Sequence, residues 1–237
     1  MTNQYPPYAT EKISEHFWVI HQQGVRCFLF EGEDMALLVD AGFGGKLKEE
    51  CEKLTDKPIH LILTHADGDH TGAAAQFGPV MMHPAEFAYC EMRSGKAVNA
   101  IPVWEDDVID IGTFRFEIIL ISGHTPGSIA LLEREKRFII TGDTVGTEPV
   151  YMFNTGRNMP AYLAAVRKLK GMSEDFDVIY ASHGKINPPK DILRQLCVLA
   201  GEITNGKYPP AKPAPAHMPE TVKIYAKGDA AFYCEKK

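Results

Sequence analysis

Four short apolar runs in this chain each end at a turn that carries a histidine or an aspartate. The four turns read Thr64-His-Ala-Asp-Gly-Asp-His-Thr71, Ser122-Gly-His-Thr-Pro-Gly127, Thr141-Gly-Asp143 and Ala181-Ser-His183-Gly. Short apolar runs bounded by such turns are typical of strands. Loops at strand ends carry function, because the sheet holds them while it leaves them accessible. The sequence therefore predicts a sheet-based fold whose polar groups gather where strands end.

The order of the predicted elements favours two similar halves. Strands are expected at residues 17–20, 25–30, 36–40, 59–63, 80–82, 114–120, 129–133, 137–140 and 177–180, with another strand-rich start near 108; helices are expected at 47–54, from 84 onward and at 160–171. The run 59–63 is nearly all apolar and follows a helix, which predicts a strand buried on both faces. This order indicates an α/β (α+β) fold of two αβ halves, about 1–110 and about 111–237, with a layered core.

The end of the chain is predicted to close the second half. Residues 208–219 are rich in Pro and Ala and are expected to form a crossing segment rather than a domain. Residues 221–234 are predicted to form a hairpin that turns at Lys227-Gly-Asp. We therefore expect one domain over 1–237.

The composition narrows the classes of partner. The chain has 25 basic and 31 acidic side chains, a net charge of −6, and its 45% apolar content is ordinary for a globular protein. This excludes collagen-like, coiled-coil and disordered chains. A nucleic-acid binder takes its affinity from clustered Lys and Arg, so the negative charge argues against that class. A small-molecule substrate is expected, and the oligomeric state is not predicted.

The cysteines and the N-terminal residues indicate the cellular location to expect for the protein. The five cysteines are widely spaced, with no C-x-x-C pair, so neither a disulfide framework nor a cysteine zinc cluster is predicted. The first residues carry neither a basic nor an apolar leader segment. No apolar run reaches the roughly 18 residues of a membrane span. We expect a cytoplasmic protein that does not cross a membrane.

Seven side chains that can bind a metal follow the predicted strands. They are His65, Asp67, Asp69, His70, His124, Asp143 and His183. Imidazole and carboxylate are ligands for zinc, iron or manganese. One such residue after one strand would be an ordinary capping group, but four strand ends that each supply one favour a metal site. The remaining histidines lack such company and are predicted to be surface or packing residues: His16, His21, His60, His83 and His217.

These motifs resemble those of the metallo-β-lactamase-fold superfamily, and the resemblance covers nearly the whole chain. It includes Leu38-Val-Asp40-Ala-Gly42, the loop His65 to His70, Gly123-His124-Thr-Pro-Gly127-Ser, Thr141-Gly-Asp143-Thr and His183-Gly. The resemblance implies a four-layer αβ/βα sandwich of two similar halves. It also implies two divalent metal ions, most often zinc, in two sites: His65, Asp67 and His124 in one, Asp69, His70 and His183 in the other, with Asp143 bridging both.

The signature loop departs from the family pattern at one position. The family signature is H-x-H-x-D-H, whereas this chain has Asp67 in place of the second histidine. A carboxylate is a harder donor than an imidazole, so iron or manganese becomes more acceptable beside zinc. Diiron members of the superfamily that reduce oxygen or nitric oxide are similar, with a glutamate at this position.

The resemblance implies a hydrolase of the glyoxalase-II-like or lactonase-like kind. A metal-bound hydroxide would attack a small ester, thioester or lactone, and Asp69 would orient that nucleophile and then pass a proton to the leaving group. Alternatives stay open: a diiron protein that binds or reduces oxygen or nitric oxide, a small phosphodiester hydrolase, and a binding module without catalysis. β-Lactamase and ribonuclease activities are less favoured, because the signature loop has no cysteine and no nucleic-acid-binding element is visible.

Substrate-binding residues are not identified by the sequence. Specificity is expected from loops at 42–45, 91–104, 148–159 and 208–218. An apolar wall of Trp104, Met152, Phe153 and Tyr208 is one hypothesis, and simple packing of these side chains is the other.

Overall fold

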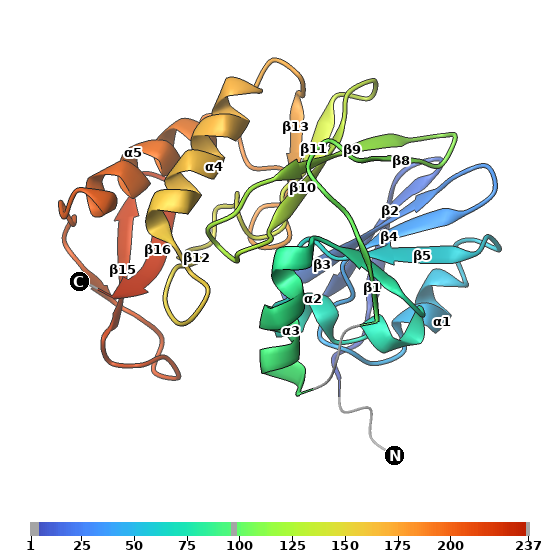
Figure 1. Cartoon of the computed structure of the whole chain (residues 1–237), viewed down its shortest axis with the longest axis horizontal. Helices are drawn as coiled ribbons and strands as arrows, with labels where there is room; N and C mark the ends of the chain where they lie inside the picture. The colour runs from blue at the N-terminus through green and yellow to red at the C-terminus, as the bar shows by residue number, and fades with distance from the viewer. Residues whose placement is uncertain (1–4, 96–98, 236–237) are drawn as a thin grey trace. The chain divides into compact units, whose positions relative to one another are not determined.

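A computed structural model describes residues 5–95 and 99–235 of the chain. The chain divides into two compact units, Met1–Ile119 and Leu120–Lys237. Figure 1 shows the first unit from blue to green and the second from yellow-green to red. Both units combine sheets with helices, as the predicted α+β class requires. A single domain over 1–237 stays a prediction.

The first unit is built on a seven-stranded sheet in which spatial order follows chain order. Its strands are β1 (Ala9–Ser14), β2 (Phe17–Gln22), β3 (Val25–Glu31), β4 (Ala36–Val39), β5 (Ile59–Ile62), β6 (Val80–Met82) and β7 (Ala100–Pro102). The strands β1 to β4 pair antiparallel, and β4 to β7 pair parallel. Because parallel strands end at the same edge of a sheet, the residues that follow β4 and β5 come together.

Short helices and one hairpin complete the first unit. They are α1 (Leu47–Cys51), α2 (Gly68–Thr71), the 3₁₀ turns η1 (Ala74–Gln76) and η2 (Pro84–Glu86), α3 (Phe87–Ser94), and the hairpin of β8 (Val108–Asp110) and β9 (Arg115–Leu120). The predicted helix 47–54 is thus a single turn that ends at Cys51. The predicted loop 91–104 is partly wrong, since α3 continues to Ser94 and β7 occupies its far end; residues 96–98 lie outside the described residues.

The first unit buries apolar side chains on both faces of its sheet, since Phe28 and Leu37 are as fully buried as their neighbours in the strands. Leu29, Leu38 and Leu61 come from neighbouring strands, are fully buried and belong to one apolar cluster. The prediction that β5 is buried on both faces is wrong at its start, where His60 is exposed. Alternate residues of a strand point to opposite faces, and at His60 the face away from the apolar cluster is open to solvent.

The second unit contains two groups of strands. In the first group β10 (Ile129–Glu133) pairs antiparallel with β11 (Phe138–Ile140), which pairs parallel with β13 (Val178–Tyr180). The other group is a four-stranded sheet in the order β12 (Val150–Tyr151), β16 (Ala230–Glu235), β15 (Val222–Lys227) and β14 (Lys212–Pro213). Strands β15 and β16 form the predicted hairpin, with Lys227 opposite Ala230 at the turn. The predicted loop 148–159 contains β12, and the crossing segment contains β14.

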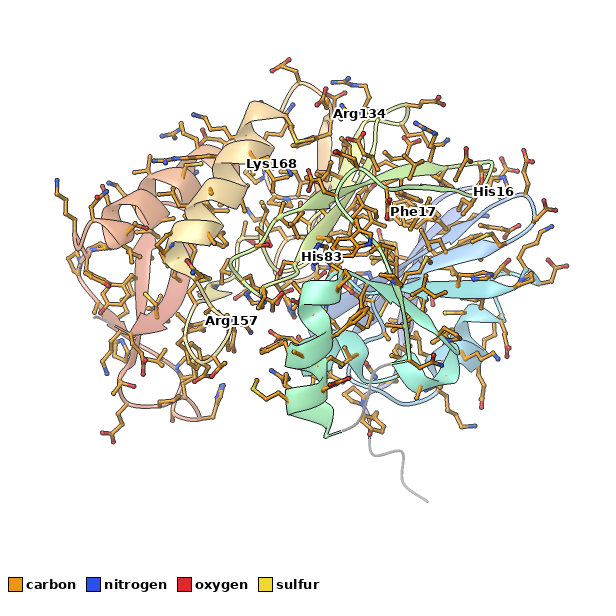
Figure 2. The ribbon with its side chains drawn as sticks, viewed as in Figure 1. His16, Phe17, His83, Arg134, Arg157 and Lys168 are labelled. Atoms are coloured by element: carbon orange, nitrogen blue, oxygen red, sulfur yellow. The ribbon has the colours of Figure 1, made fainter. Side chains whose placement is uncertain are left out.

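Two helices of 13 residues each, α4 (Met159–Gly171) and α5 (Ile192–Thr204), pack side by side in the second unit (Figure 1). The start of α4 follows ordinary capping rules, since the Asn158 side chain accepts a hydrogen bond from the Ala161 amide and a proline opens the helix. In Figure 2 Lys168 extends from α4, and its ammonium donates to the Leu120 carbonyl at 3.3 Å. Helix α5 was not predicted.

No helix of the described residues is long and apolar enough to cross a membrane. All five cysteines are free: Cys27, Cys51, Cys90, Cys197 and Cys234.

Candidate metal centre

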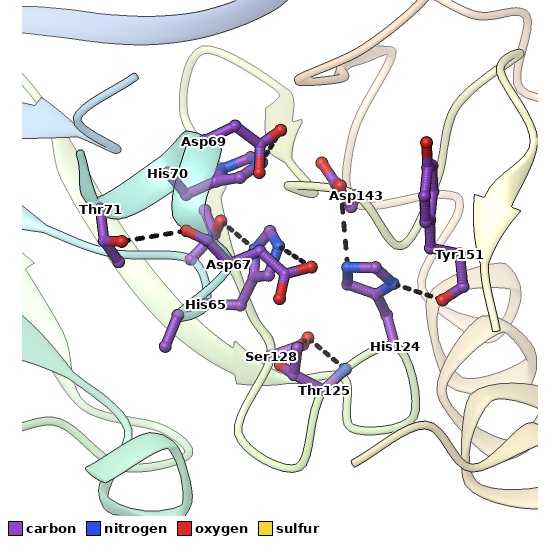
Figure 3. A network of polar contacts seen from close by, with 12 residues as sticks. His65, Asp67, Asp69, His70, Thr71, His124, Thr125, Ser128, Asp143 and Tyr151 are labelled. Atoms are coloured by element: carbon purple, nitrogen blue, oxygen red, sulfur yellow. Dashed lines mark hydrogen bonds and ion pairs between the residues drawn. The ribbon is translucent and has the colours of Figure 1, made fainter. Parts of the chain in front are cut away.

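The segment between β5 and the end of α2 carries four of the predicted ligands. His65 and His70 are buried, and their ring centroids lie 4.1 Å apart. His65 Nε2 lies 3.6 Å from Asp67 Oδ2, and His70 Nε2 lies 3.7 Å from Asp69 Oδ2 (Figure 3). One short segment of the first unit therefore presents two imidazole–carboxylate pairs.

The carboxylate of Asp40 supports this segment from the end of β4. Asp40 has a left-handed backbone with φ 64° and is fully buried. It accepts hydrogen bonds from the Thr64 amide and hydroxyl, each at 2.8 Å, and lies 2.8 Å from His70 Nδ1. Parallel strands β4 and β5 end side by side, as the 2.9 Å bond from the Asp40 amide to the Ile62 carbonyl shows, which is why these groups meet.

The partners of His65 and His70 decide which ring nitrogen carries the proton. His70 Nδ1 faces the Asp40 carboxylate, which only accepts hydrogen bonds. The Thr64 hydroxyl donates its one hydrogen bond to Asp40, so its oxygen accepts from His65 Nδ1 at 3.0 Å. In both neutral rings the lone pair is therefore on Nε2. Metal-ligating histidines typically donate their other N–H to a carboxylate or to a polar acceptor in this way.

Helix α3 contacts the same segment at Asp67. The Tyr89 hydroxyl donates to Asp67 Oδ1 at 2.8 Å, and Arg93 Nη1 lies 3.1 Å from the same oxygen. Arg93 also donates to the Tyr89 hydroxyl at 3.1 Å. One turn earlier, the buried carboxylate of Glu86 accepts from the Ala66 amide at 2.7 Å. The stretch from η2 to α3 therefore holds the backbone and one side chain of the loop after β5.

The second unit brings the other three predicted ligands together. His124 Nε2 lies 3.7 Å and His183 Nε2 lies 3.2 Å from the Asp143 carboxylate. Asp143 follows β11 and His183 follows β13, and these neighbouring parallel strands remain paired past their ends through the Ser182 amide and the Gly142 carbonyl, 3.2 Å apart. His124 Nδ1 lies 3.1 Å from the Tyr151 carbonyl, so its lone pair is also on Nε2 (Figure 3).

The turn that carries His124 is fixed by its own polar groups. The Thr125 amide donates to the Ser128 hydroxyl at 3.1 Å, and the two hydroxyls lie 2.6 Å apart (Figure 3). Arg157 donates to the His124 carbonyl at 2.5 Å. Gly123 has φ 136°, and a Cβ atom there would overlap the backbone of Tyr162. The packing of α4 therefore requires glycine directly before His124.

The loop Gly42 to Gly45 is also held firmly. The buried amide of Gln22 donates to the Gly44 carbonyl and accepts from the Phe43 amide, both at 2.8 Å. The Gly72 amide, at the end of α2, donates to the Gly42 carbonyl at 2.8 Å, and a Cβ atom on Gly72 would overlap the backbone of Phe43. The Phe43 side chain itself is 39% exposed.

The donor groups of each unit fit a divalent metal. Three histidines present Nε2 lone pairs beside carboxylates, and imidazole with carboxylate is a donor set that zinc, iron and manganese accept. All seven predicted residues belong to clusters of histidine and aspartate side chains that could hold a metal ion. Sequence reasoning assigned no role to Asp40, Glu86, Tyr89 or Arg93. Asp40 ends a strand as the other candidates do, so the same rule would have found it.

The five other histidines have the surface or packing roles that were predicted. His83 (Figure 2) precedes η2 and accepts from the Ala85 amide at 3.2 Å. Its ring meets the Trp104 ring edge-on, with centroids 5.4 Å apart. Burial lowers the pKa of His83. His21 pairs with Glu11 at 3.2 Å on the surface, and His217 is exposed.

Sequence comparisons identify related proteins over most of the chain. The family model described as the metallo-beta-lactamase superfamily matches residues 22–183. The chain is 27% identical to the alpha subunit of 2,4-dinitroanisole O-demethylase from Nocardioides sp. (strain JS1661), over 75% of this chain and 58% of that subunit. It is 28% identical to hydroxyacylglutathione hydrolase GloC from Haemophilus influenzae (66% of this chain, 83% of the relative) and 24% identical to an acyl-coenzyme A thioesterase from Gallus gallus (65% and 71%).

Solved structures share the fold. A metallo-beta-lactamase from Pontibacter korlensis superposes with a TM-score of 0.70 and 19% identity, over 82% of this chain and 99% of that protein. One from Hirschia baltica gives 0.67 and 17% identity, over 82% and 98%. At these identities the likeness concerns the fold alone. It confirms the predicted α+β fold of the metallo-β-lactamase kind.

Proposed function

Since the chain belongs to the metallo-β-lactamase superfamily, we propose that it cleaves a small ester, thioester or lactone. The fold and the relatives support the predicted class of metal-dependent hydrolase. The observation that carries this proposal is the common orientation of His65, His70 and His124. Each has Nδ1 against an acceptor and Nε2 beside a carboxylate. Such rings are prepared to bind a metal ion rather than to shuttle protons between neighbours.

In this proposal the seven ligands hold two divalent ions. His65, Asp67 and His124 form one site, and Asp69, His70 and His183 form the other, with Asp143 shared. Support comes from the match between the chain's motifs and the family signature, and from the pairs that each unit forms by itself. We propose zinc as the metal, with iron or manganese as alternatives that the carboxylate at position 67 favours.

The bound ions would supply Lewis-acid stabilisation of a developing oxyanion and a water nucleophile at neutral pH. The protein's own groups supply orientation and proton transfer. The Asp69 side chain is 23% exposed, whereas that of its neighbour His70 is fully buried, so the Asp69 carboxylate is accessible to solvent. We assign Asp69 to orient the attacking water and to pass a proton to the leaving group. Thiolate and alkoxide groups leave with little help, which suits the proposed substrates.

The names of the relatives refine the choice of substrates to test. Two of them are named as enzymes that hydrolyse thioesters: a hydroxyacylglutathione hydrolase and an acyl-coenzyme A thioesterase. Another is named for demethylation of an aryl ether, so an aryl methyl ether belongs in the test panel as well. We place the enzyme in the cytoplasm, a location that five free cysteines support.

The experiment measures metal content and turnover on the same preparation. Protein purified without chelators is analysed for zinc, iron and manganese, and is assayed on thioesters, lactones, simple esters, phosphodiesters and an aryl methyl ether. We expect zinc and turnover of an ester-type substrate, lost in Asp143→Ala and retained in Asp229→Asn, a control in the exposed turn between β15 and β16. Two irons with an oxo-bridge absorption band would instead establish the redox alternative.

A further inference from the structure

The carboxylate of Asp67 is not symmetric in its surroundings. Oδ1 receives the Tyr89 hydroxyl at 2.8 Å and Arg93 Nη1 at 3.1 Å. Oδ2 is the oxygen that faces His65 Nε2, at 3.6 Å. The two oxygens of one carboxylate therefore have separate tasks, one toward helix α3 and one toward the neighbouring imidazole.

From this geometry we propose that Tyr89 and Arg93 are positioning residues that hold Asp67 as a one-oxygen metal ligand. A carboxylate without such partners can rotate about its last bond and can bind a metal through both oxygens. With Oδ1 engaged by two donors, Oδ2, which faces His65, is the oxygen that would bind a metal. Asp67 then offers a single donor atom in a fixed direction, as an imidazole does.

The arrangement of Tyr89 and Arg93 follows from their spacing on α3. Residues four apart lie on the same face of a helix, so both side chains reach one oxygen. Arg93 also donates to the Tyr89 hydroxyl at 3.1 Å and lies over the ring, with its guanidinium carbon 5.6 Å from the centroid. The Tyr89 hydroxyl accepts a hydrogen bond from Arg93 and donates one to Asp67, so the three groups form one directed network.

Geometry matters more here than charge. The Arg93 side chain is 43% exposed, so water screens its charge, whereas the Asp67 side chain is 12% exposed. A screened cation lowers the repulsion between Asp67 and the second carboxylate of the segment only slightly. The fixed orientation of Oδ1 does not depend on screening, and Glu86 holds the adjacent Ala66 amide in the same way. Loss of the Tyr89 hydroxyl or of the Arg93 guanidinium should therefore reduce metal affinity, because Asp67 is then no longer held in position.

This inference rests on the proposed metal site, and a double-mutant cycle tests it without any assay of turnover. Zinc affinity is measured by competition with a chromophoric chelator for the parent, Tyr89→Phe and Arg93→Met, and for the same changes in an Asp67→Ala background. We expect each change to weaken zinc binding on the order of 10-fold in the parent, the low end of the effect of losing a partner of a metal ligand. In the Asp67→Ala background neither change should weaken it further.

Two controls separate positioning from folding. Arg115→Met removes an arginine that is 61% exposed on β9 and should leave zinc affinity unchanged. Tyr89→Phe keeps the ring and removes only the hydroxyl, and metal-free variants are compared by near-ultraviolet circular dichroism and melting temperature. A purely structural role for the pair would lower the melting temperature and would weaken zinc binding equally in both backgrounds, which overturns the proposal.

The remaining outcomes are also decisive. Zinc affinity that is unchanged or higher in Arg93→Met and Tyr89→Phe would overturn the positioning role, as would a parent protein that binds no divalent metal. A parent that binds zinc but hydrolyses no member of the substrate panel would refute the proposed function, while the cycle would still report on Asp67. The two proposals can therefore fail separately.

Discussion

The carboxylate of Asp40 lies 2.8 Å from Nδ1 of His70, and both side chains are fully buried. The same carboxylate accepts the Thr64 hydroxyl, whose oxygen in turn accepts from His65 Nδ1. One aspartate therefore determines the proton position on two imidazoles of the first unit. Because a buried polar network of this kind is costly when it is only partly satisfied, its members must be retained together.

Asp40→Asn should weaken zinc binding by about 10- to 100-fold, the usual effect of losing a hydrogen-bond partner of a ligand. The amide nitrogen of Asn is a donor, and when it faces His70 Nδ1 it stabilises the ring with its proton on Nε2, which cannot bind a metal. Competition with a chromophoric chelator measures the loss. Asp56→Asn, an exposed control in the same unit, should have the parent affinity. Equal affinities for the two variants would contradict the role of Asp40.

Gly123→Ala should lower the stability of the protein by an amount at the upper end of the roughly 1–3 kcal/mol range for overpacking. The added methyl group would meet the backbone of Tyr162, which cannot move without displacing α4, and φ at 136° disfavours any side chain. Urea unfolding gives the change in free energy. Gly171→Ala is the matched control, because nothing lies within 4 Å of its Cβ position at the end of α4. We expect that control to be neutral or slightly stabilising.

Addition of zinc to metal-free protein should raise its melting temperature, and EDTA should reverse the effect. A ligand that binds only the native state stabilises it by about 2.7 kcal/mol at a free concentration 100 times the dissociation constant. Differential scanning fluorimetry over a range of zinc concentrations measures the shift. Replacement of His70 by Ala should make the shift smaller, because one of the two proposed sites then lacks its imidazole. A melting temperature independent of zinc in the parent would argue against the metal centre.

The five thiols should differ in reactivity. Cys27, Cys51 and Cys234 are buried, and burial raises the pKa of the Cys51 and Cys234 thiols to about 12. Native protein treated with iodoacetamide near pH 8 should therefore be labelled only at Cys90 and Cys197, which are half-buried. Peptide mass spectrometry identifies the sites, with urea-unfolded protein as the fully labelled reference. Labelling of Cys51 at the rate of Cys90 would contradict the burial.

The same thiols set a pH dependence of stability. Below the unfolded pKa of about 8.5 these groups are neutral in both states and contribute no pH dependence. Above it the unfolded thiols lose protons while the native ones keep them. Deprotonation therefore stabilises the unfolded state, and the free energy of unfolding falls as pH rises. The urea concentration at the unfolding midpoint should decrease between pH 8 and pH 10. In Cys51→Ser and in Cys234→Ser the decrease should be smaller, when each variant is compared with its own midpoint at pH 8. A midpoint that rises over this window would contradict the sign.

The candidate ligands were predictable because each follows a strand directly. A strand places its last residue at a known edge, so His65, His124, Asp143 and His183 needed no tertiary information. Tyr89 and Arg93 lie on a helix, and nothing local connects them with Asp67, 22 and 26 positions earlier. Their spacing of four residues showed a shared helix face, but not what that face contacts.

The errors in the predicted elements have physical causes. The apolar run 59–63 does not reveal that one face of β5 is open at His60, since burial depends on what covers a strand. Helix α5 did carry a usable signal, because Ile192, Leu196, Leu199 and Ile203 are buried at helical spacing. The apolar spacing alone was sufficient to predict this helix.

The contact between Gly72 and Phe43 limits how this enzyme can diverge. The loop at Gly42 to Gly45 is hydrogen-bonded to Gln22 and packs against Gly72 with no space for a methyl group. The backbone of this loop and that of the ligand-bearing segment therefore cannot change independently. The side chain at position 43 is the exception, because it is 39% exposed and its replacement leaves the backbone bonds intact. Laboratory evolution of new specificity should therefore start by randomising position 43 alone.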